Sequence, residues 1–281
     1  MRPALVSAPA SWTLDATFSW ANSAIVQSST RESLIVDAET RELRLSLARG
    51  FEHGLALRLH LPLRETTAGS LDGFIDDWHS TFGLPEGARP TLTEDSLRLF
   101  YRRDGRVAFA STSSARGIGD IAIDVGKQLG ASERGAFAGW LSLKLPTGDA
   151  NEFAGSGSVD VAASMSGQQR FGERWEVFGQ LSGTWLGNGD RLSTLQRDLV
   201  WAATAGISVD VFGALQLTVQ LDAHTGVFDS DTDFLGDAVL LSLGGTYAFE
   251  SDWQLSAAVT EDIDVETSPD VVFVLALRKT F

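Results

Sequence analysis

Apolar and polar residues alternate with a period of two through most of this 281-residue sequence. Between residues 55 and 63, for example, every second residue is leucine, while Ala56, Arg58, His60 and Pro62 occupy the intervening positions. This is the period of a β-strand with one apolar and one polar face. The alternation predicts about twelve strands of roughly ten residues, the length that crosses an outer membrane when tilted. The predicted strands are residues 12–20, 43–47, 55–63, 121–129, 137–145, 159–165, 175–185, 201–211, 214–224, 239–249, 253–259 and 271–281.

The connections between these strands are short and long in turn. The short ones are residues 50–53, 130–135, 170–174, 212–213 and 250–252, and the long ones are residues 22–31, 64–119, 147–157, 187–198, 225–236 and 261–270. Tight periplasmic turns and long outer loops are typical of up-and-down outer-membrane barrels. An even number of strands places both termini on the periplasmic side. The sequence therefore predicts an all-β transmembrane antiparallel up-and-down barrel of about twelve strands, forming a single domain over residues 1–281.

A soluble β-sandwich or a lipocalin-like cup is the competing interpretation, because their strands alternate as well. A sealed interior tolerates charge poorly, yet the polar face here often carries several charges on one strand. Tryptophans lie near strand ends, as in the aromatic girdles of barrels: Trp12, Trp20, Trp175, Trp185 and Trp253. The last strand ends on Phe281, a residue type that the barrel-assembly machinery commonly reads. Lys279 departs from that pattern, although a lysine can snorkel at an interface.

Composition narrows the classes of function further. The net charge of −15 argues against nucleic acid, because phosphate binding requires clustered Lys and Arg. The absence of cysteine excludes disulfides, thiolate metal sites and a cysteine nucleophile. No apolar run approaches the roughly 20 residues of a membrane helix, and no apolar signal-peptide core follows Met1. We therefore expect a mature chain without its leader, or otherwise a cytoplasmic protein.

Several segments resemble domain-of-unknown-function family 3187, a family of proteobacterial outer-membrane proteins. The matching segments are LDGFIDDWHSTFGLPEGAR (71–89), LSLKLPTGD (141–149), GSGSVD (155–160), VQLDAH (219–224) and VFVLALRKTF (272–281). They keep their expected order and cover most of the chain from about residue 34 onward. The resemblance implies an exported outer-membrane barrel whose signal peptide is missing from this sequence. It implies no established activity, so the function must be argued from the residues.

The segment 71–82 has helical rather than strand periodicity and lies in the second outer connection. One stripe of the helix is apolar and consists of Leu71, Phe74, Ile75, Trp78 and Phe82. Asp72, Asp76 and His79 share another face within reach of one cation, but they also suit the two ends of a helix dipole. Two carboxylates and one imidazole make a thin metal shell. We therefore predict a short helix, ended by Gly83 and Pro85, that folds over or into the barrel mouth with its carboxylates towards water and no metal.

The polar faces of the strands supply the candidate lumen-lining residues. These are Asp15, Arg44, Arg58, His60, Arg64, Asp120, Asp124, Lys144, Asp160, Glu176, Asp210, Gln220, Asp222, His224 and Arg278. Those on the first three strands become neighbours of Arg278 once the first and last strands pair. One interpretation is an eyelet of opposed charges that selects small polar or anionic solutes. The other is a salt-bridged interior that holds a narrow barrel shut, with no permeation.

Two outer connections, residues 228–237 and 261–270, are acidic. Asp229, Asp231 and Asp233 imitate the start of an EF-hand loop, but the glycine at position 6 and the glutamate at position 12 are absent. We expect flexible acidic loops on a solvated rim. The alternative is weak Ca²⁺ or Mg²⁺ bridging to lipopolysaccharide.

Catalysis at the rim is the remaining alternative. Asp222 and His224 share one strand face near the outer end, where barrel hydrolases place their dyads, and such a dyad could activate water. However, no serine lies two residues from a histidine, and no GxSxG elbow is present. We therefore predict a protein that is not an enzyme.

Taken together, the residues predict a narrow channel or passive transporter for small solutes, with a loop helix at its mouth. The alternatives are a non-conducting structural or envelope-interaction barrel with a plugged lumen and, behind it, a rim hydrolase. The expected location is the outer membrane of a Gram-negative bacterium. Expected partners are outer-membrane lipid and lipopolysaccharide, the barrel-assembly machinery through the strand ending at Phe281, and a small polar solute. No cofactor and no nucleic acid are expected.

Overall fold

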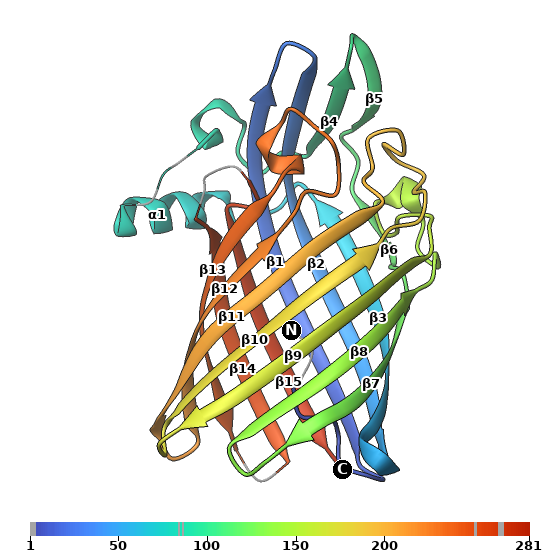
Figure 1. Ribbon diagram of the computed structural model, residues 1–281. Helices are drawn as coiled ribbons and strands as arrows, with labels where there is room; N and C mark the ends of the chain where they lie inside the picture. The colour runs from blue at the N-terminus through green and yellow to red at the C-terminus, as the bar shows by residue number, and fades with distance from the viewer. Residues whose placement is uncertain (1–3, 84, 86, 250–251, 264–266) are drawn as a thin grey trace.

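The computed structural model describes residues 4–83, 85, 87–249, 252–263 and 267–281, with the backbone alone at residue 82. Twelve of its strands form a closed antiparallel barrel (Figure 1). They are β1 (Trp12–Ser28), β2 (Glu32–Phe51), β3 (Leu55–Thr67), β7 (Ala122–Ala131), β8 (Gly135–Lys144), β9 (Asp160–Phe171), β10 (Trp175–Trp185), β11 (Leu199–Phe212), β12 (Leu215–His224), β13 (Ala238–Ala248), β14 (Trp253–Asp262) and β15 (Val271–Thr280). The first and last strands pair from Thr13–Thr280 to Asn22–Val271, which closes the sheet. The predicted twelve-stranded barrel is confirmed.

The outward face of the barrel carries large apolar side chains. Leu141, Leu181 and Leu243 are each more than half exposed, which costs roughly 25 cal/mol for every Å² left in water. Trp175 and Trp185 lie ten residues apart on the outward face of β10. At about 3.3 Å per residue and a tilt of about 40°, they are separated by about 25 Å along the barrel axis, the height of the apolar band of an outer-membrane barrel. The outward face therefore fits an apolar medium bordered by aromatic residues.

The outer end carries more β-structure than the sequence predicted. Residues 22–31 were expected to be a loop, but β1 and β2 continue as a paired hairpin as far as Ser28 and Ser33. Within the expected second outer connection, β4 (Arg98–Arg103) and β5 (Arg106–Ser111) extend this sheet, and β6 (Ala115–Ile118) pairs with the outer part of β3. In the β1–β2 hairpin, apolar and polar residues continue to alternate above the apolar band of the barrel. The outer part of the sheet also buries one face against other parts of the protein, and that face must be apolar.

The inward face of this outer sheet is covered by loops. Ile25, Leu34 and Tyr101 are buried there, against side chains from the β10–β11 and β12–β13 connections. The packed side chains from those connections are Leu192, Leu195, Phe234 and Leu235. The second of these connections is also fixed by the Glu32 carboxylate, which accepts a hydrogen bond from the Asp231 amide at 3.1 Å. The acidic segment 228–237, expected to be flexible, is thus folded onto the outer sheet.

The inner end of the barrel is partly filled by the N-terminal segment. The chain turns back inside the barrel before β1 begins (Figure 1). Val6 packs against Ala56, Ala138 and Trp140, which are inward-facing positions of β3 and β8. Its amide donates to Gln128 Oε1 at 3.0 Å. Residues 4–8 therefore narrow the barrel interior near the end that carries the short connections.

Over the residues that the structure describes, one α-helix and four 3₁₀ turns complete the fold. They are α1 (Asp72–Phe82), η1 (Glu52–Gly54), η2 (Arg89–Thr91), η3 (Ala150–Glu152) and η4 (Asp233–Leu235). Among the described residues, no helix has the length and apolar character needed to cross a bilayer. The helix predicted over residues 71–82 is confirmed within one residue.

Candidate functional site

A cavity of about 650 Å³ lies inside the barrel against the strands from β2 to β10. Its wall carries most of the ionisable residues that the alternation assigns to the inward face. Candidates that border the cavity are Arg44, Arg58, His60, Arg64, Asp120, Asp124, Lys144 and Asp160. They come from neighbouring strands because β2, β3, β7, β8 and β9 are paired in that order. We call the inward face of β2, β3, β7 and β8 the charged wall.

A chain of hydrogen bonds crosses the charged wall from β2 to β8. Ser46 Oγ lies 2.8 Å from His60 Nδ1, and His60 Nε2 lies 3.0 Å from Asp124 Oδ2. A carboxylate only accepts, so Nε2 carries a proton, and in the neutral ring Nδ1 then accepts from the Ser46 hydroxyl. Ser142 donates to the second oxygen of Asp124. Asp124 is 1% exposed, and Arg58 lies directly opposite it in the β3–β7 register.

This chain has the residue types of a Ser–His–Asp triad, but its geometry suits structure better than catalysis. Ser46 is only 6% exposed, so an ester carbonyl could not reach its hydroxyl. The residue lies in mid-strand, paired with Asp15 on one side and His60 on the other. Backbone N–H groups there are used by the sheet, whereas an oxyanion hole needs donors directed at the substrate. These hydrogen bonds hold β2, β3, β7 and β8 together, and we assign no nucleophile among the three residues.

Two arginines bracket one carboxylate near the outer part of the cavity. Arg44 Nη2 lies 2.6 Å from Glu42 Oε1, and Arg64 Nη2 lies 3.1 Å from Glu42 Oε2. The Arg44 and Arg64 side chains are 53% and 43% exposed, whereas that of Glu42 is 12% exposed. We call these three residues the arginine pair station. It presents two exposed positive charges against one sheltered negative charge, a local excess of one positive charge.

Glu42 was not among the sequence-predicted candidates. Alternation could have identified it, because it lies two residues before Arg44 on the same inward face of β2. Ser46 and Ser142 occupy inward positions by the same rule. No sequence motif surrounds Glu42, Ser46 or Ser142, so only their inward positions distinguish them.

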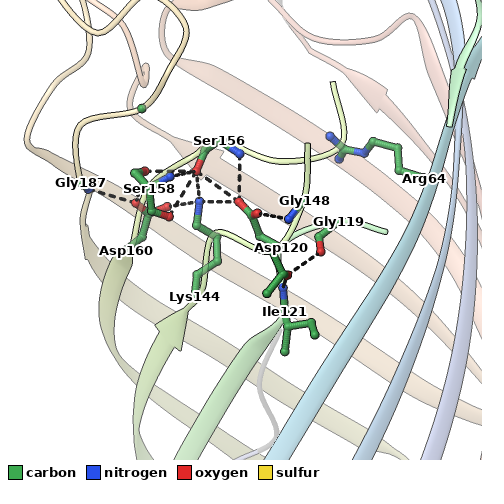
Figure 2. A network of polar contacts seen from close by, with 12 residues as sticks. Arg64, Gly119, Asp120, Ile121, Lys144, Gly148, Ser156, Ser158, Asp160 and Gly187 are labelled. Atoms are coloured by element: carbon green, nitrogen blue, oxygen red, sulfur yellow. Dashed lines mark hydrogen bonds and ion pairs between the residues drawn. The ribbon is translucent and has the colours of Figure 1, made fainter. Parts of the chain in front are cut away.

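A second ion cluster ties the β8–β9 connection to the charged wall (Figure 2). The Lys144 ammonium lies 2.9 Å from Asp120 and 2.7 Å from Asp160, and it also donates to Ser156. An ammonium has three donors, and the three partners use them all. Asp160 in turn accepts from the Gly187 amide at 3.0 Å. The KLPTGD and GSGSVD segments thus meet at one lysine.

Asp120 lies in the outer connection between β6 and β7 and is held by more than the lysine. It accepts from the Ser156 amide at 2.9 Å and from the Gly148 amide at 3.0 Å. Burial pushes the pKa of Asp120 upward, but these amides and the Lys144 ammonium outweigh it, so that the pKa is lowered. Gly157 has a φ of +76°, and a Cβ there would overlap the Asp190 carboxylate. The β8–β9 connection therefore requires glycine at position 157. The lowered pKa means that the folded state favours the charged form of Asp120.

The remaining predicted lumen residues lie on inward positions but make separate pairs. Arg278 donates to Asp15 at 2.5 Å across the β1–β15 seam. Arg170 pairs with Asp210 between β9 and β11, and Gln168 donates to Glu176 at 3.4 Å. The inner half of the wall thus holds two ion pairs and one carboxylate, Glu176, that is bound by an uncharged amide.

The proposed rim dyad is not assembled. Asp222 accepts hydrogen bonds of 2.6 Å from Thr204 and of 2.6 Å from Gln220. His224 Nδ1 lies 3.2 Å from the Thr225 carbonyl oxygen and is solvent-exposed. The two side chains bind different partners, so this geometry does not support the hydrolase alternative. Within the described residues, no group of three or more His, Asp or Glu side chains could hold a metal ion.

The helix α1 lies beside the outer end of the barrel (Figure 1). Phe74 and Trp78 contact the ring of Phe273 at centroid distances of 5.9 and 6.4 Å. Phe273 alternates with Val272 and Val274 on β15 and faces outward, like Leu275 and Leu277. The apolar stripe, which also includes Leu71 and the buried Ile75, was predicted to pack on the wall at the mouth. It packs on the outside of the wall, because periodicity identifies an apolar face without identifying which surface covers it; the side chain of Phe82 lies outside the described residues.

The carboxylates on α1 also differ from expectation. Asp72, expected to face water, is 8% exposed and accepts from Arg89 at 3.0 Å. Arg89 also donates to Asp76 at 2.7 Å, to Asn22 at 2.7 Å and to Asp270 at 3.0 Å. Sequence reasoning missed Arg89, which lies beyond the helix and carries no periodic signal. One buried guanidinium thus takes the place that a cation would have filled.

Comparison with known proteins agrees with this architecture. The model of the family described as "Protein of unknown function (DUF3187)" matches residues 1–281. The chain therefore belongs to this family, as its motifs indicated. A search of curated proteins finds no match.

Solved structures share the fold at low sequence identity. The COG4313 outer membrane channel from Pseudomonas putida F1 aligns with a TM-score of 0.67 and 15% identity, covering 99% of this chain and 98% of the other. The KdgM porin aligns with a TM-score of 0.51 and 8% identity over 96% of this chain and 99% of its own. The NanC porin aligns with a TM-score of 0.51 and 8% identity over 95% of this chain and 98% of its own. The fold is that of outer-membrane channels and porins.

Proposed function

We propose that this protein is a passive channel of the Gram-negative outer membrane for small polar or anionic solutes, which it contacts at the arginine pair station. The single observation that carries the proposal is the exposure of Arg44 and Arg64 to the cavity while their shared carboxylate, Glu42, is sheltered. An exposed guanidinium presents donors in a geometry that matches carboxylate and phosphate groups.

The balance of charge elsewhere in the lumen supports the same choice of solute. Lys144 is shared by two carboxylates, and Arg278 and Arg170 each face one. These ions are committed to wall contacts, so they interact weakly with a passing solute. The arginine pair station is the local positive excess, and a rim or eyelet of one sign selects ions of the opposite sign.

A non-conducting barrel is the second candidate, because Val6 and its neighbours fill part of the inner lumen. The amide of Val6 and the carbonyl of Ala4 are both bound by Gln128, at 3.0 Å each. A lumen closed at this level would make the interior a purely structural network. The two candidates differ in conductance, with and without residues 4–10.

Planar-bilayer recording of the full chain and of a chain that begins at Ser11 tests the proposal. We expect discrete channels, with larger conductance for the shorter chain because residues 4–8 narrow the lumen of the full chain. Absence of current from both chains would support the structural candidate and contradict the channel.

Selectivity tests the station itself. Replacing Arg44 and Arg64 together by Gln should shift the reversal potential in a KCl gradient towards cation preference. Replacing Arg102 and Arg106 together by Gln is the matched control, because it removes the same two positive charges from exposed positions of the outer hairpin β4–β5. Equal reversal potentials for the Arg44 and Arg64 double variant and the parent would show that the station does not meet the permeating ion.

A further inference from the structure

The helix α1 is fastened to the outside of the barrel at three points. At its start, the fully buried Glu39 carboxylate accepts from the Ser70 and Leu71 amides at 2.6 and 2.5 Å. Farther along, Trp78 Nε1 donates to Glu261 at 2.9 Å. Glu39 and Glu261 occupy outward positions of β2 and β14 by strand alternation. Together with the Phe273 contact, they lay the helix across the outward faces of β2, β1, β15 and β14.

The third fastening is Arg89, which follows the helix and is 8% exposed. It joins Asp72 and Asp76 of α1 to Asn22 of β1 and to Asp270 of the β14–β15 connection. Removing one partner from such a buried charge cluster is strongly unfavourable. The orientation of α1 on the barrel is therefore fixed.

The height of α1 follows from β15. Phe273 and Phe281 are eight residues apart on the same outward face, which corresponds to about 20 Å along the barrel axis at a tilt of about 40°. Phe281 is 68% exposed and lies at the periplasmic end, near Lys279, which is 5.6 Å from its ring centroid. An apolar band of about 25 Å that starts there ends just above Phe273. The helix thus lies at the outer edge of the band.

The exposed side of α1 has an apolar edge and a polar edge, as expected for a helix at the boundary between lipid and water. Ile75 and His79 are buried against the protein, at 0% and 5% exposure. Phe74 is 51% exposed and shares an edge of the helix with Trp78, because the two are four residues apart. Asp77 and Ser80 are exposed on another side. An apolar edge meets the lipid-facing wall, and a polar edge lies away from it.

We infer that α1 is an interfacial helix that lies in the outer leaflet of the membrane, with Phe74 and Trp78 in contact with lipid acyl chains and Asp77 and Ser80 among the headgroups. The exposed Phe74 ring is continuous with the outward apolar face of the barrel. Because lipid covers that face along the whole barrel, lipid is the partner that we assign to Phe74 as well. Amphipathic helices with aromatic residues on one side bury that side at this boundary. The inference requires an outer-membrane location but stands whether or not the barrel conducts.

Single nitroxide labels test the inference directly, because the chain contains no cysteine. Phe74→Cys and Ser80→Cys would be labelled in phosphatidylethanolamine–phosphatidylglycerol vesicles. Collisions with oxygen, which enters lipid, would be compared with collisions with a water-soluble nickel chelate. Leu141→Cys on the outward face of β8 gives the lipid reference, and Val107→Cys on β5 gives the water reference.

The expected ratio of oxygen to nickel collisions at position 74 is several-fold higher than at position 80 and lies between the two references. A ratio at position 74 equal to that of Val107→Cys would overturn the inference. Dipolar broadening between labels on two copies would also overturn it, because a second copy would then be the occupant.

A second variant tests whether Arg89 holds the helix at this position on the barrel. Arg89→Met should release the clamp and increase the mobility of a label at position 74, while channel conductance stays unchanged. A label shielded by protein alone would collide rarely with both oxygen and the nickel chelate. Low collision rates with both reagents at position 74 would therefore show that protein covers Phe74, and they would contradict the inference.

Discussion

The charged wall and the wall formed by β13 and β14 have the same inward alternation but different chemistry. On the charged wall, Asp124 and Lys144 are each held by several partners, and most of the partners are ionic or charge-assisted. On the opposite wall, hydroxyls pair with hydroxyls across neighbouring strands. Ser242 lies 2.7 Å from Thr260, and Thr246 lies 2.8 Å from Ser256.

The contrast shows that two kinds of polar interior give one barrel different local stability. Removing one partner of a buried charge pair typically costs about 3–5 kcal/mol, whereas a neutral hydrogen bond contributes about 1 kcal/mol. The charged wall is therefore rigid and sensitive to single substitutions. The hydroxyl wall, lined with small neutral residues, should tolerate change and leaves room for a solute beside the fixed ions.

The largest effect should follow from Asp124→Ala. The substitution leaves His60 and Ser142 without their acceptor in the charged wall, so unfolding free energy should fall by about 3 kcal/mol. Urea unfolding in detergent micelles measures the change. Asp124→Asn keeps the shape and one acceptor oxygen, and it should cost clearly less. A loss below about 1 kcal/mol for the alanine variant would show that the polar contacts of the two walls contribute equally to stability.

Lys144→Met should come next, at about 2 kcal/mol, because the lysine is partly exposed and solvent can partly replace it. Asp120 and Asp160 would then face each other without the ammonium. A triple variant that also carries Asp120→Asn and Asp160→Asn should recover part of the loss, since no uncompensated charge remains. Failure of the triple variant to recover any stability would mean that the hydroxyl and amide contacts carry the cluster.

Acid should weaken the attachment of the β8–β9 connection, which Asp120 holds through the Gly148 and Ser156 amides. The lowered pKa of Asp120 means that the folded state favours its charged form, so its contribution to stability is present above the ordinary pKa of an aspartate and is lost as pH falls through the lower folded value. A nitroxide on Asn151→Cys, in the connection that Asp120 holds, should gain mobility in strong acid. The same label in an Asp120→Asn background should be mobile at neutral pH already and show no such transition.

The smallest effect should be found on the hydroxyl wall. Ser242→Ala alone leaves one hydroxyl of the pair without its partner and should cost about 1 kcal/mol or less. Adding Thr260→Val removes both hydroxyls and should bring stability close to that of the parent. Urea unfolding of both variants provides the measurement. A loss comparable to that of Asp124→Ala would remove the distinction between the walls.

The sequence was sufficient for the barrel because alternation is repeated along every strand and one-sided burial enforces it. It failed for the outer hairpin of β4 and β5, although a signal was present. Asp104-Gly105, between two alternating segments, is a strong hairpin turn signal, and both residues have positive φ. The turn was missed because residues 64–119 were interpreted as a single loop with one helix.

The sequence predicted which residues of the candidate site face the lumen but not which of them pair. Alternation placed Arg44, Arg64 and Lys144 on inward positions, but which ions pair depends on strand stagger, which one sequence does not specify. Helix periodicity found α1 and its apolar stripe for the same reason that alternation found the strands. Neither period tells whether a segment folds into the lumen or over the outside, because both surfaces offer apolar contacts.

The seam between β1 and β15 has a consequence for the order of folding. Asp15 and Arg278 are 263 residues apart in the chain, and Trp12 and Phe281 exchange backbone hydrogen bonds of 3.2 and 2.8 Å at the end of the seam. The sheet keeps two open edges until the last strand of the chain, β15, is available to pair with β1. Contacts of such separation form slowly, and unpaired strand edges aggregate while they wait. The chain therefore must be kept apart from its own copies until β15 pairs with β1.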